Sequence, residues 1–198
     1  MATERRGKEG RETKETRVSV EVNLDGTGQA DIATGVGMLD HLLEQIAKHS
    51  LIDITIKAEG DLQIDPHHTA EDVAICLGRA LKQALGQRRG IVRFAHAVVP
   101  LDEALALVAI DVSGRGYAAL ELDWTGERVG ELPTDLVGHM LWSIATEARL
   151  TLHARILAGA SDHHKAEAVF KALARALGAA TRLDPRLAGQ VPSTKGTL

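Results

Sequence analysis

The sequence predicts an α/β (α+β) fold built from two duplicated half-domains, each a mainly four-stranded sheet with two helices. A doubled motif is the first observation, since Asp65-Pro66-His67-His68-Thr69-Ala70-Glu71 returns as Ser161-Asp162-His163-His164-Lys165-Ala166-Glu167. Apolar helical runs follow both copies at the same offsets from the glutamate. In each half, strand-like segments precede a helix, a strand and a second helix. The economical packing buries the aliphatic faces of these helices against the sheets.

The first half begins with the charged residues 1–14, which lack periodicity and which we expect to form a disordered N-terminal arm. From residue 15 to residue 88, period-two alternation predicts strands and period-3.6 spacing predicts helices. The strands are 18–24, 29–34 and 51–59, and the helices are 37–49 and 66–85. Asp65 is a natural N-cap for the second helix, and Pro66 suits its first turn.

The second half is predicted to span residues 89–185, after a seam at 86–90 that is bounded by glycines. Its strands are 91–99, 104–112, 117–124 and 150–158, its helices are 134–147 and 163–180, and a connecting loop covers 126–133. Residues 186–198 contain nothing that would form a core element, so we expect them to be a C-terminal tail.

The bulk composition limits the possible functions. With 198 residues, 44% of them hydrophobic, the chain can bury a real core, and an aromatic content of 3% makes that core aliphatic. The formal net charge of -4 argues against a nucleic-acid partner, because phosphate contacts need a basic face. No signal peptide or long apolar segment indicates a membrane. The single Cys76 excludes an internal disulfide and fits a reducing cytoplasm.

The doubled motif indicates two metal centres. On a helix, His67 and Glu71 are i,i+4 neighbours and His68 and Glu71 are i,i+3 neighbours, so either pair could share one ion. Adjacent histidines diverge by roughly 100°, so we expect each His pair to be split between two metals. His41 and His139 precede the two motifs in helical patterns. The predicted ligands are therefore His41, His67, His68, Glu71, His139, His163, His164 and Glu167.

Ligands of this kind suit manganese, zinc or iron, and the residues alone do not rank these metals. Four protein ligands on each of two ions would leave open positions for a substrate. The residues alone therefore fit a catalytic metal site, with no preference for one reaction.

Both motifs resemble the signatures of the imidazoleglycerol-phosphate dehydratase family of histidine biosynthesis, in residues 64–71 and 159–171. The similarity runs from about residue 12 to residue 198 and includes the tail Val191-Pro192-Ser193-Thr194-Lys195-Gly196. Because this tail matches the family, we expect residues 186–198 to lie over the active site and to become ordered when the substrate phosphate is bound. Ser161 departs from the Asp or Asn usual there, but serine can still cap a helix. The resemblance implies a left-handed α/β sandwich like the second domain of ribosomal protein S5.

The resemblance also implies an activity and an assembly. The activity is that of a carbon-oxygen lyase (hydro-lyase), which dehydrates D-erythro-imidazole glycerol phosphate to imidazole acetol phosphate and water. It implies two divalent ions per subunit, most suitably Mn²⁺. The homo-oligomer implied is a hollow particle of 24 subunits assembled from trimers, with active sites at subunit contacts. We expect each active site to be shared between subunits. A chain this short can hardly bring its N-terminal arm, its C-terminal tail and all the metal ligands to one cleft.

The reaction removes a carbon-bound proton beside an imidazole ring, so it needs an acid/base group. Glu15, in Thr13-Lys14-Glu15-Thr16, matches the family's Lys-Glu-Thr and is the first candidate; from sequence alone, an ordinary charge of the arm is the simpler interpretation. Glu167 is the second candidate, as ligand and base together. The residues implied in substrate binding, where cations and a hydroxyl would hold the phosphate, are Glu15, Gln45, Arg93, Arg115, Lys171, Ser193 and Lys195.

The remaining histidines, His49, His96 and His153, are expected to be structural rather than ligands. Asp102-Glu103 either orients a ligand histidine or forms a turn. Two other functions compete: a binuclear metallohydrolase acting on a phosphorylated small molecule, and a non-enzymatic metal-binding assembly. The first leaves the family-like tail without a role. Against the second, ferritin-like sites carry Glu-x-x-His on long helices, whereas here the order is reversed and strands separate the helices.

Overall fold

The computed structural model describes residues 5–187 and 189–198 and confirms a mixed α/β fold made of two similar halves. The first half contains β1 (Arg6–Glu12), β2 (Thr16–Asn23), β3 (Ala30–Ala33), α1 (Gly37–Ser50), β4 (Asp53–Gly60) and α2 (His67–Leu85). The second half contains β5 (Phe94–Leu101), β6 (Ala104–Asp111), β7 (Tyr117–Glu121), β8 (Arg128–Val129), β9 (Leu132–Pro133), α3 (Thr134–Ala148), β10 (Thr151–Ala158) and α4 (Asp162–Thr181). A 3-10 turn, η1 (Pro185–Leu187), follows.

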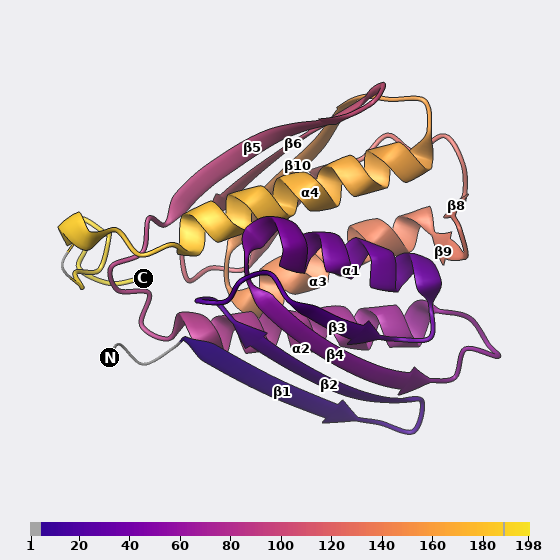
Figure 1. Ribbon diagram of the computed structural model, residues 1–198, viewed down its shortest axis with the longest axis horizontal. Coiled ribbons are helices and arrows are strands. Elements are labelled where there is room, and N and C mark those ends of the chain that lie inside the picture. The colour runs from indigo at the N-terminus through magenta and orange to yellow at the C-terminus, as the bar shows by residue number, and fades with distance from the viewer. Residues whose placement is uncertain (1–4, 188) are drawn as a thin grey trace.

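The helices lie between two sheets, which form the outer layers (Figure 1). In the described part of the chain, α1 and α2 contact the first sheet, and α3 and α4 contact the second. The two helical layers meet through α1 against α4 and α2 against α3. Each motif helix therefore packs against a helix of the other half, α4 against α1 and α2 against α3.

The internal duplication is visible in the strand order. The first sheet has the order β1-β2-β4-β3 and the second has the order β5-β6-β10-β7, so equivalent strands occupy equivalent places. In both sheets the last pair is parallel and the other pairs are antiparallel. Each predicted helix begins and ends within two residues of the observed one.

The expected disordered arm is wrong for residues 6–12, which form the edge strand β1, whereas residues 1–4 lie outside the described residues. The strand was missed because its inward side chains are polar and match polar groups of α2. Arg11 Nε donates to Asp72 Oδ1 at 2.6 Å, and Gln83 Nε2 donates to Glu9 Oε2 at 2.7 Å. The first half therefore begins near Arg6, with β1 in the same place in its sheet as β5 in the second sheet.

The expected loop over 126–133 contains a short hairpin, β8–β9, which is paired through Val129 and Leu132. This hairpin caps a helix of the other half, since Met38 N donates to Glu131 Oε1 at 2.9 Å at the start of α1. The expected cap of α4 is confirmed, since Ser161 Oγ accepts from His164 N. The expected N-cap of α2 is wrong by one residue: Pro66 is the N-cap, and Asp65 Oδ1 accepts from His67 N at 2.7 Å just before the helix.

The core between the sheets is aliphatic, as the composition predicts. Among the described residues, Phe170 is the one aromatic side chain that is fully buried. Glycines allow the helices to approach closely: a Cβ at Gly78 would lie 2.7 Å from Glu147 of α3, and one at Gly178 would lie 2.5 Å from Ser50 of α1. The helical layer is therefore packed tightly enough to fix the positions of the side chains at its ends.

The outer faces of the two sheets differ in chemistry. The first sheet exposes charged side chains such as Arg17, Lys57 and Asp31, whereas the second exposes the apolar Phe94 and Val98 together with the Glu121–Arg155 ion pair. Within residues 5–187 and 189–198, every helix is too short or too polar to span a bilayer.

Candidate functional site

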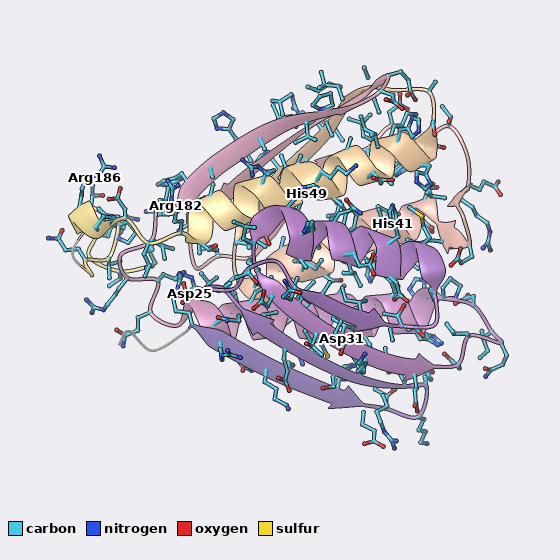
Figure 2. The ribbon with its side chains drawn as sticks, viewed as in Figure 1. Asp25, Asp31, His41, His49, Arg182 and Arg186 are labelled. Carbon is cyan, nitrogen blue, oxygen red and sulfur yellow. The ribbon has the colours of Figure 1, made fainter. Side chains whose placement is uncertain are left out.

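The first candidate metal centre lies where α1 packs against the first turns of α4. His41 Nε2 lies 2.9 Å from Glu167 Oε1, and His163 Nε2 lies 3.0 Å from the same oxygen. The ligand atoms of these three residues lie within 4.8 Å of one another. In Figure 2, His41 appears toward the end of α1 that lies near the beginning of α4. Two imidazole nitrogens and one carboxylate are a donor set that suits manganese, zinc or iron.

The second candidate centre joins α2 to α3. His139 Nε2 lies 3.2 Å from Glu71 Oε1, and His67 Nε2 lies 3.8 Å from Glu71 Oε2. These three residues again place their ligand atoms within 4.8 Å of one another. His139 Nε2 is buried and has no hydrogen-bond partner in the described part of the chain. An orphaned nitrogen of this kind is costly unless a ligand occupies it, so the residues fit a metal ion.

Each candidate centre combines residues of both halves, and the pairing crosses over. His41 of the first half joins the motif of the second half, and His139 of the second half joins the motif of the first. Both motifs use the i,i+4 spacing, so His67 and His163 face their glutamates. The spacing alone also allowed the i,i+3 pairs, in which His68 and His164 would share an ion with the glutamates. In the folded chain the i,i+4 pairs join the two centres instead.

His68 and His164 lie outside both centres within this chain. Each ring stands nearly perpendicular to the ring of the preceding histidine, at centroid distances of 6.2 Å. His68 Nδ1 donates to Asp61 Oδ2 at 3.0 Å, and His164 Nδ1 donates to Glu103 Oε2 at 2.7 Å. These hydrogen bonds raise the pKa of both imidazoles. The bond with His164 lowers the pKa of Glu103 to about 2.

Glu167 contacts three nitrogen-bearing side chains in the first centre. Burial raises its pKa, but hydrogen bonds from Lys171, His41 and His163 outweigh burial and hold the pKa at about 2. Lys171 Nζ forms an ion pair with Glu167 Oε2 at 2.6 Å. The carboxylate is therefore ionised at neutral pH, as a metal ligand must be. Gln45 Nε2 donates to His41 O at 3.3 Å, one turn further along α1.

Glu15 lies beside His68 of the first motif. It belongs to the turn between β1 and β2, and its backbone carbonyl accepts from Asp61 N at 3.1 Å. Its carboxylate Oε2 comes within 3.9 Å of His68 Nδ1, and the side chain is half-exposed. Glu15 is therefore fixed near a predicted ligand and is not one charge of a loose arm.

Most candidates for phosphate binding lie at the end of the molecule opposite the two candidate metal centres. Arg93 Nη1 donates to Pro192 O at 2.7 Å, and Gly114, next to Arg115, packs against Leu198. The tail with Ser193 and Lys195 is thus held near Arg93 and the 113–116 turn. Arg93 N also donates to Ala180 O, near the end of α4.

That end of α4 is far from the metal centre at its beginning. At 1.5 Å per residue, the helix separates Ala180 from His163 by ~25 Å. Figure 2 shows the same separation, with His41 near one end of the molecule and Arg182 and Arg186 at the other. Lys171 is the exception, because it contacts Glu167 directly.

The other histidines take no part in the two centres. His49 lies near Lys171 and Arg175, and burial together with these charges lowers its pKa. His96 and His153 are exposed on the second sheet, and His153 lies 6.2 Å from the Tyr117 ring. Asp102 forms the β5–β6 turn with a positive φ of 48°. The sequence left two roles open for Asp102-Glu103. Asp102 forms a turn, and Glu103 contacts the predicted ligand His164.

A family model described as imidazoleglycerol-phosphate dehydratase matches residues 34–177, which include every residue of both centres. The chain belongs to the imidazoleglycerol-phosphate dehydratase family. The resemblance carried by the doubled motif is therefore confirmed.

Relatives and solved structures of the imidazoleglycerol-phosphate dehydratase family match along nearly all of the chain. The protein of that name from Chloroflexus aggregans is 59% identical over 198 residues, covering 100% of this chain and 97% of the relative. The one from Methanothermobacter thermautotrophicus is 50% identical and is covered completely, as is this chain.

Two crystal structures of the family have a TM-score of 0.82 to this fold. The Staphylococcus aureus enzyme is 34% identical, and the match covers 90% of this chain and 99% of that one. The Pyrococcus furiosus enzyme, in complex with (S)-C348, is 36% identical, with coverage of 96% and 100%.

Sequence reasoning missed one residue of this imidazoleglycerol-phosphate dehydratase site. Asp61 faces His68 with both carboxylate oxygens, at 3.0 and 3.2 Å. It lies in the irregular segment between β4 and α2, where no periodicity predicts the direction of a side chain. The second half offered a signal by analogy. There, Asp102-Glu103 was considered as a carboxylate partner for a ligand histidine, and the first half could have been searched for an equivalent.

Proposed function

We propose that the chain dehydrates imidazole glycerol phosphate to imidazole acetol phosphate in histidine biosynthesis, using two divalent metal ions, most suitably Mn²⁺. The observation that carries this proposal is the pair of His-His-Glu groups built across the halves of a chain of this family. Each group offers three protein ligands, which leaves coordination positions open.

His68 and His164 complete the ligand inventory when the chain assembles. Their Nε2 atoms have no hydrogen-bond partner within the described ranges, and neither residue belongs to a centre of its own chain. We assign them to metal ions held jointly with neighbouring subunits. Metal binding then contributes its free energy to association.

A metal ion bound there supplies Lewis acidity to a nitrogen of the substrate's imidazole ring. Glu15 is the residue that we assign to proton transfer at carbon. Its carboxylate is half-exposed and lies near His68, so it can reach a substrate beside the metal. Glu167, whose oxygens already face His41, His163 and Lys171, is better suited to holding the metal than to taking up a proton.

The substrate phosphate would be held by residues of two subunits. Lys171 and Gln45 lie near the first centre, whereas Arg93, Arg115, Ser193 and Lys195 lie at the far end of the chain. A ~25 Å separation along α4 exceeds the length of a small substrate. The far end of one chain must therefore reach the metal end of another.

Closed symmetry repeats this contact without leaving an open end, and a hollow 24-subunit particle of trimers satisfies it. We place this assembly in the cytoplasm. The buried Cys76, whose pKa is raised to about 11 by burial, is an inert thiol that fits a reducing compartment.

A dehydration assay with imidazole glycerol phosphate, with and without chelator, tests the activity. We expect loss of activity on chelation and recovery on addition of Mn²⁺. Release of inorganic phosphate in place of dehydration would identify a metallohydrolase, and metal binding without turnover would identify a storage or scaffold protein. Light scattering on the same samples tests the assembly, which we expect to fall to a smaller species without metal.

A further inference from the structure

His68 and His164 occupy equivalent places in the two halves, and each has a carboxylate partner outside its motif. Asp61 approaches His68 Nδ1 at 3.0 and 3.2 Å, and Glu103 approaches His164 Nδ1 at 2.7 Å. The partners come from different positions: Asp61 follows β4, and Glu103 lies between β5 and β6. The two halves thus present the same hydrogen bond with different supporting residues.

An ionised carboxylate can only accept, so Nδ1 must carry the proton in both rings. A neutral imidazole then has its lone pair on Nε2, the atom that faces no hydrogen-bond partner in the described residues. We propose that Asp61 and Glu103 are positioning residues that fix the tautomer and orientation of His68 and His164, so that Nε2 is available to a metal ion. This inference rests on the proposed function, since it assumes that these histidines are ligands.

The two carboxylates differ in how they are held, and the difference makes the inference testable. Glu103 Oε1 accepts from Ala160 N at 3.2 Å and from Ser161 N at 2.8 Å, while Oε2 accepts from His164. Both oxygens of Glu103 are therefore committed. Both oxygens of Asp61 face the same ring, and no other group among the described residues donates to its carboxylate.

This difference predicts opposite effects of the two amide variants. In Glu103→Gln, the carbonyl oxygen must stay on the backbone donors, so the NH₂ group faces His164 Nδ1. That group can only donate, which forces the proton onto Nε2 and removes the lone pair. In Asp61→Asn, the side chain is free to present its carbonyl oxygen to His68, and the tautomer is kept.

Mn²⁺ affinity of the full-length protein, measured by equilibrium dialysis after chelation, is the readout. We expect Glu103→Gln to weaken binding by ~10–100-fold, the range seen when partners of metal-binding histidines are lost. Glu103→Ala should weaken it less, because the ring can then choose either tautomer. Asp61→Asn should stay close to wild type, and Asp61→Ala should lose affinity.

Controls separate the possible failures. Glu121→Gln changes an exposed carboxylate that pairs with Arg155 and should bind Mn²⁺ as wild type does. Nitrogen-15 spectra of His164 in the metal-free protein should show the proton on Nδ1 in wild type and on Nε2 in Glu103→Gln.

If Glu103→Ala is as damaging as Glu103→Gln, or more so, the carboxylate only supports the 160–161 backbone and the inference is wrong. Unchanged affinity in Glu103→Gln overturns it equally. If the Glu103 variants do not fold, the Asp61 pair decides alone: equal loss in Asn and Ala contradicts tautomer control. Failure of the wild-type protein to bind Mn²⁺ would instead refute the proposed function.

Discussion

The Nε2 atom of His139 lies 3.2 Å from Glu71 Oε1, buried and without a hydrogen bond in the part of the chain that the structure describes. Such a nitrogen is tolerated when a metal ion takes its lone pair. His139→Ala should therefore remove about one of two bound ions per chain, as measured by elemental analysis after gel filtration. His153→Ala, an exposed histidine of the second sheet, is the matched control and should retain both. Equal metal content in the two variants would remove His139 from the ligand set.

Glu15→Gln should separate chemistry from metal binding. The amide keeps the shape of the side chain but cannot take up a proton, so kcat should fall by ~10²-fold or more at unchanged metal content. Glu12→Gln alters a nearby exposed carboxylate paired with Arg17 and should leave kcat as it is. A wild-type kcat in Glu15→Gln would assign proton transfer to another group.

Deletion of residues 191–198 tests the tail. Its removal takes away Ser193 and Lys195 and the Pro192 carbonyl that Arg93 binds, but no buried core residue. We expect KM for the substrate to rise by at least 10-fold, with a thermal unfolding midpoint close to that of the full chain. An unchanged KM would show that the tail has no part in phosphate binding.

Mixed assemblies test whether sites are shared between chains. Glu15→Gln impairs the metal end, and Lys195→Ala impairs the far end, so each variant alone should be poorly active. Dissociating both by chelation, mixing them equally and restoring metal should return roughly a quarter of wild-type activity, because random mixing pairs two intact ends at about that frequency. No recovery above the separate variants would indicate that each site belongs to one chain.

Asp162→Asn should weaken the fold at the start of α4. Asp162 accepts from Gly126 N at 2.6 Å and from Lys165 Nζ at 3.0 Å, and Lys165 is almost fully buried. The variant should lose about 2 kcal/mol of unfolding free energy in urea, measured without metal, because the buried ammonium keeps a weaker partner. Asp31→Asn, at an exposed pair with Lys57, should change it by less than about 0.5 kcal/mol.

The same carboxyl predicts a pH dependence. Burial raises the pKa of Asp162, but hydrogen bonds from Thr125, Lys165 and Gly126 outweigh it and lower the pKa to about 2 from 3.8. Its contribution is therefore fully present above pH ~4 and is lost as the pH falls toward 2. The difference in stability between wild type and Asp162→Asn should shrink over that range, and a constant difference would contradict the assignment.

Local patterns predicted most of the fold and the inventory of the site. The alternation at Val18, Val20 and Val22 and the i,i+4 spacing of His67 and Glu71 depend on neighbours in sequence, so they could be read directly. What failed depends on tertiary packing. In β1 the inward positions Glu9 and Arg11 are satisfied by polar groups of α2, so no hydrophobic alternation marks the strand.

The pairing of ligands was also beyond local patterns. Nothing near His41 in the sequence indicates that it faces Glu167 and not Glu71, because that choice follows from α1 packing on α4. Likewise, the separation of Arg93 from the metal centres appears only when α4 is seen to run from one end of the molecule to the other (Figure 1).

The crossed pairing of His41 with α4 and His139 with α2 bears on how such a chain could have arisen. A polypeptide equivalent to one half would carry a histidine and a His-Glu pair that face different partners, so alone it would hold no complete centre. Two copies joined through their helices would hold two, related by a twofold axis. Fusion of the two genes would keep both centres and would allow the sequences of the two halves to diverge. The outer sheet faces already differ, since the second exposes Phe94 and Val98 and the first exposes charged side chains at Arg17 and Lys57.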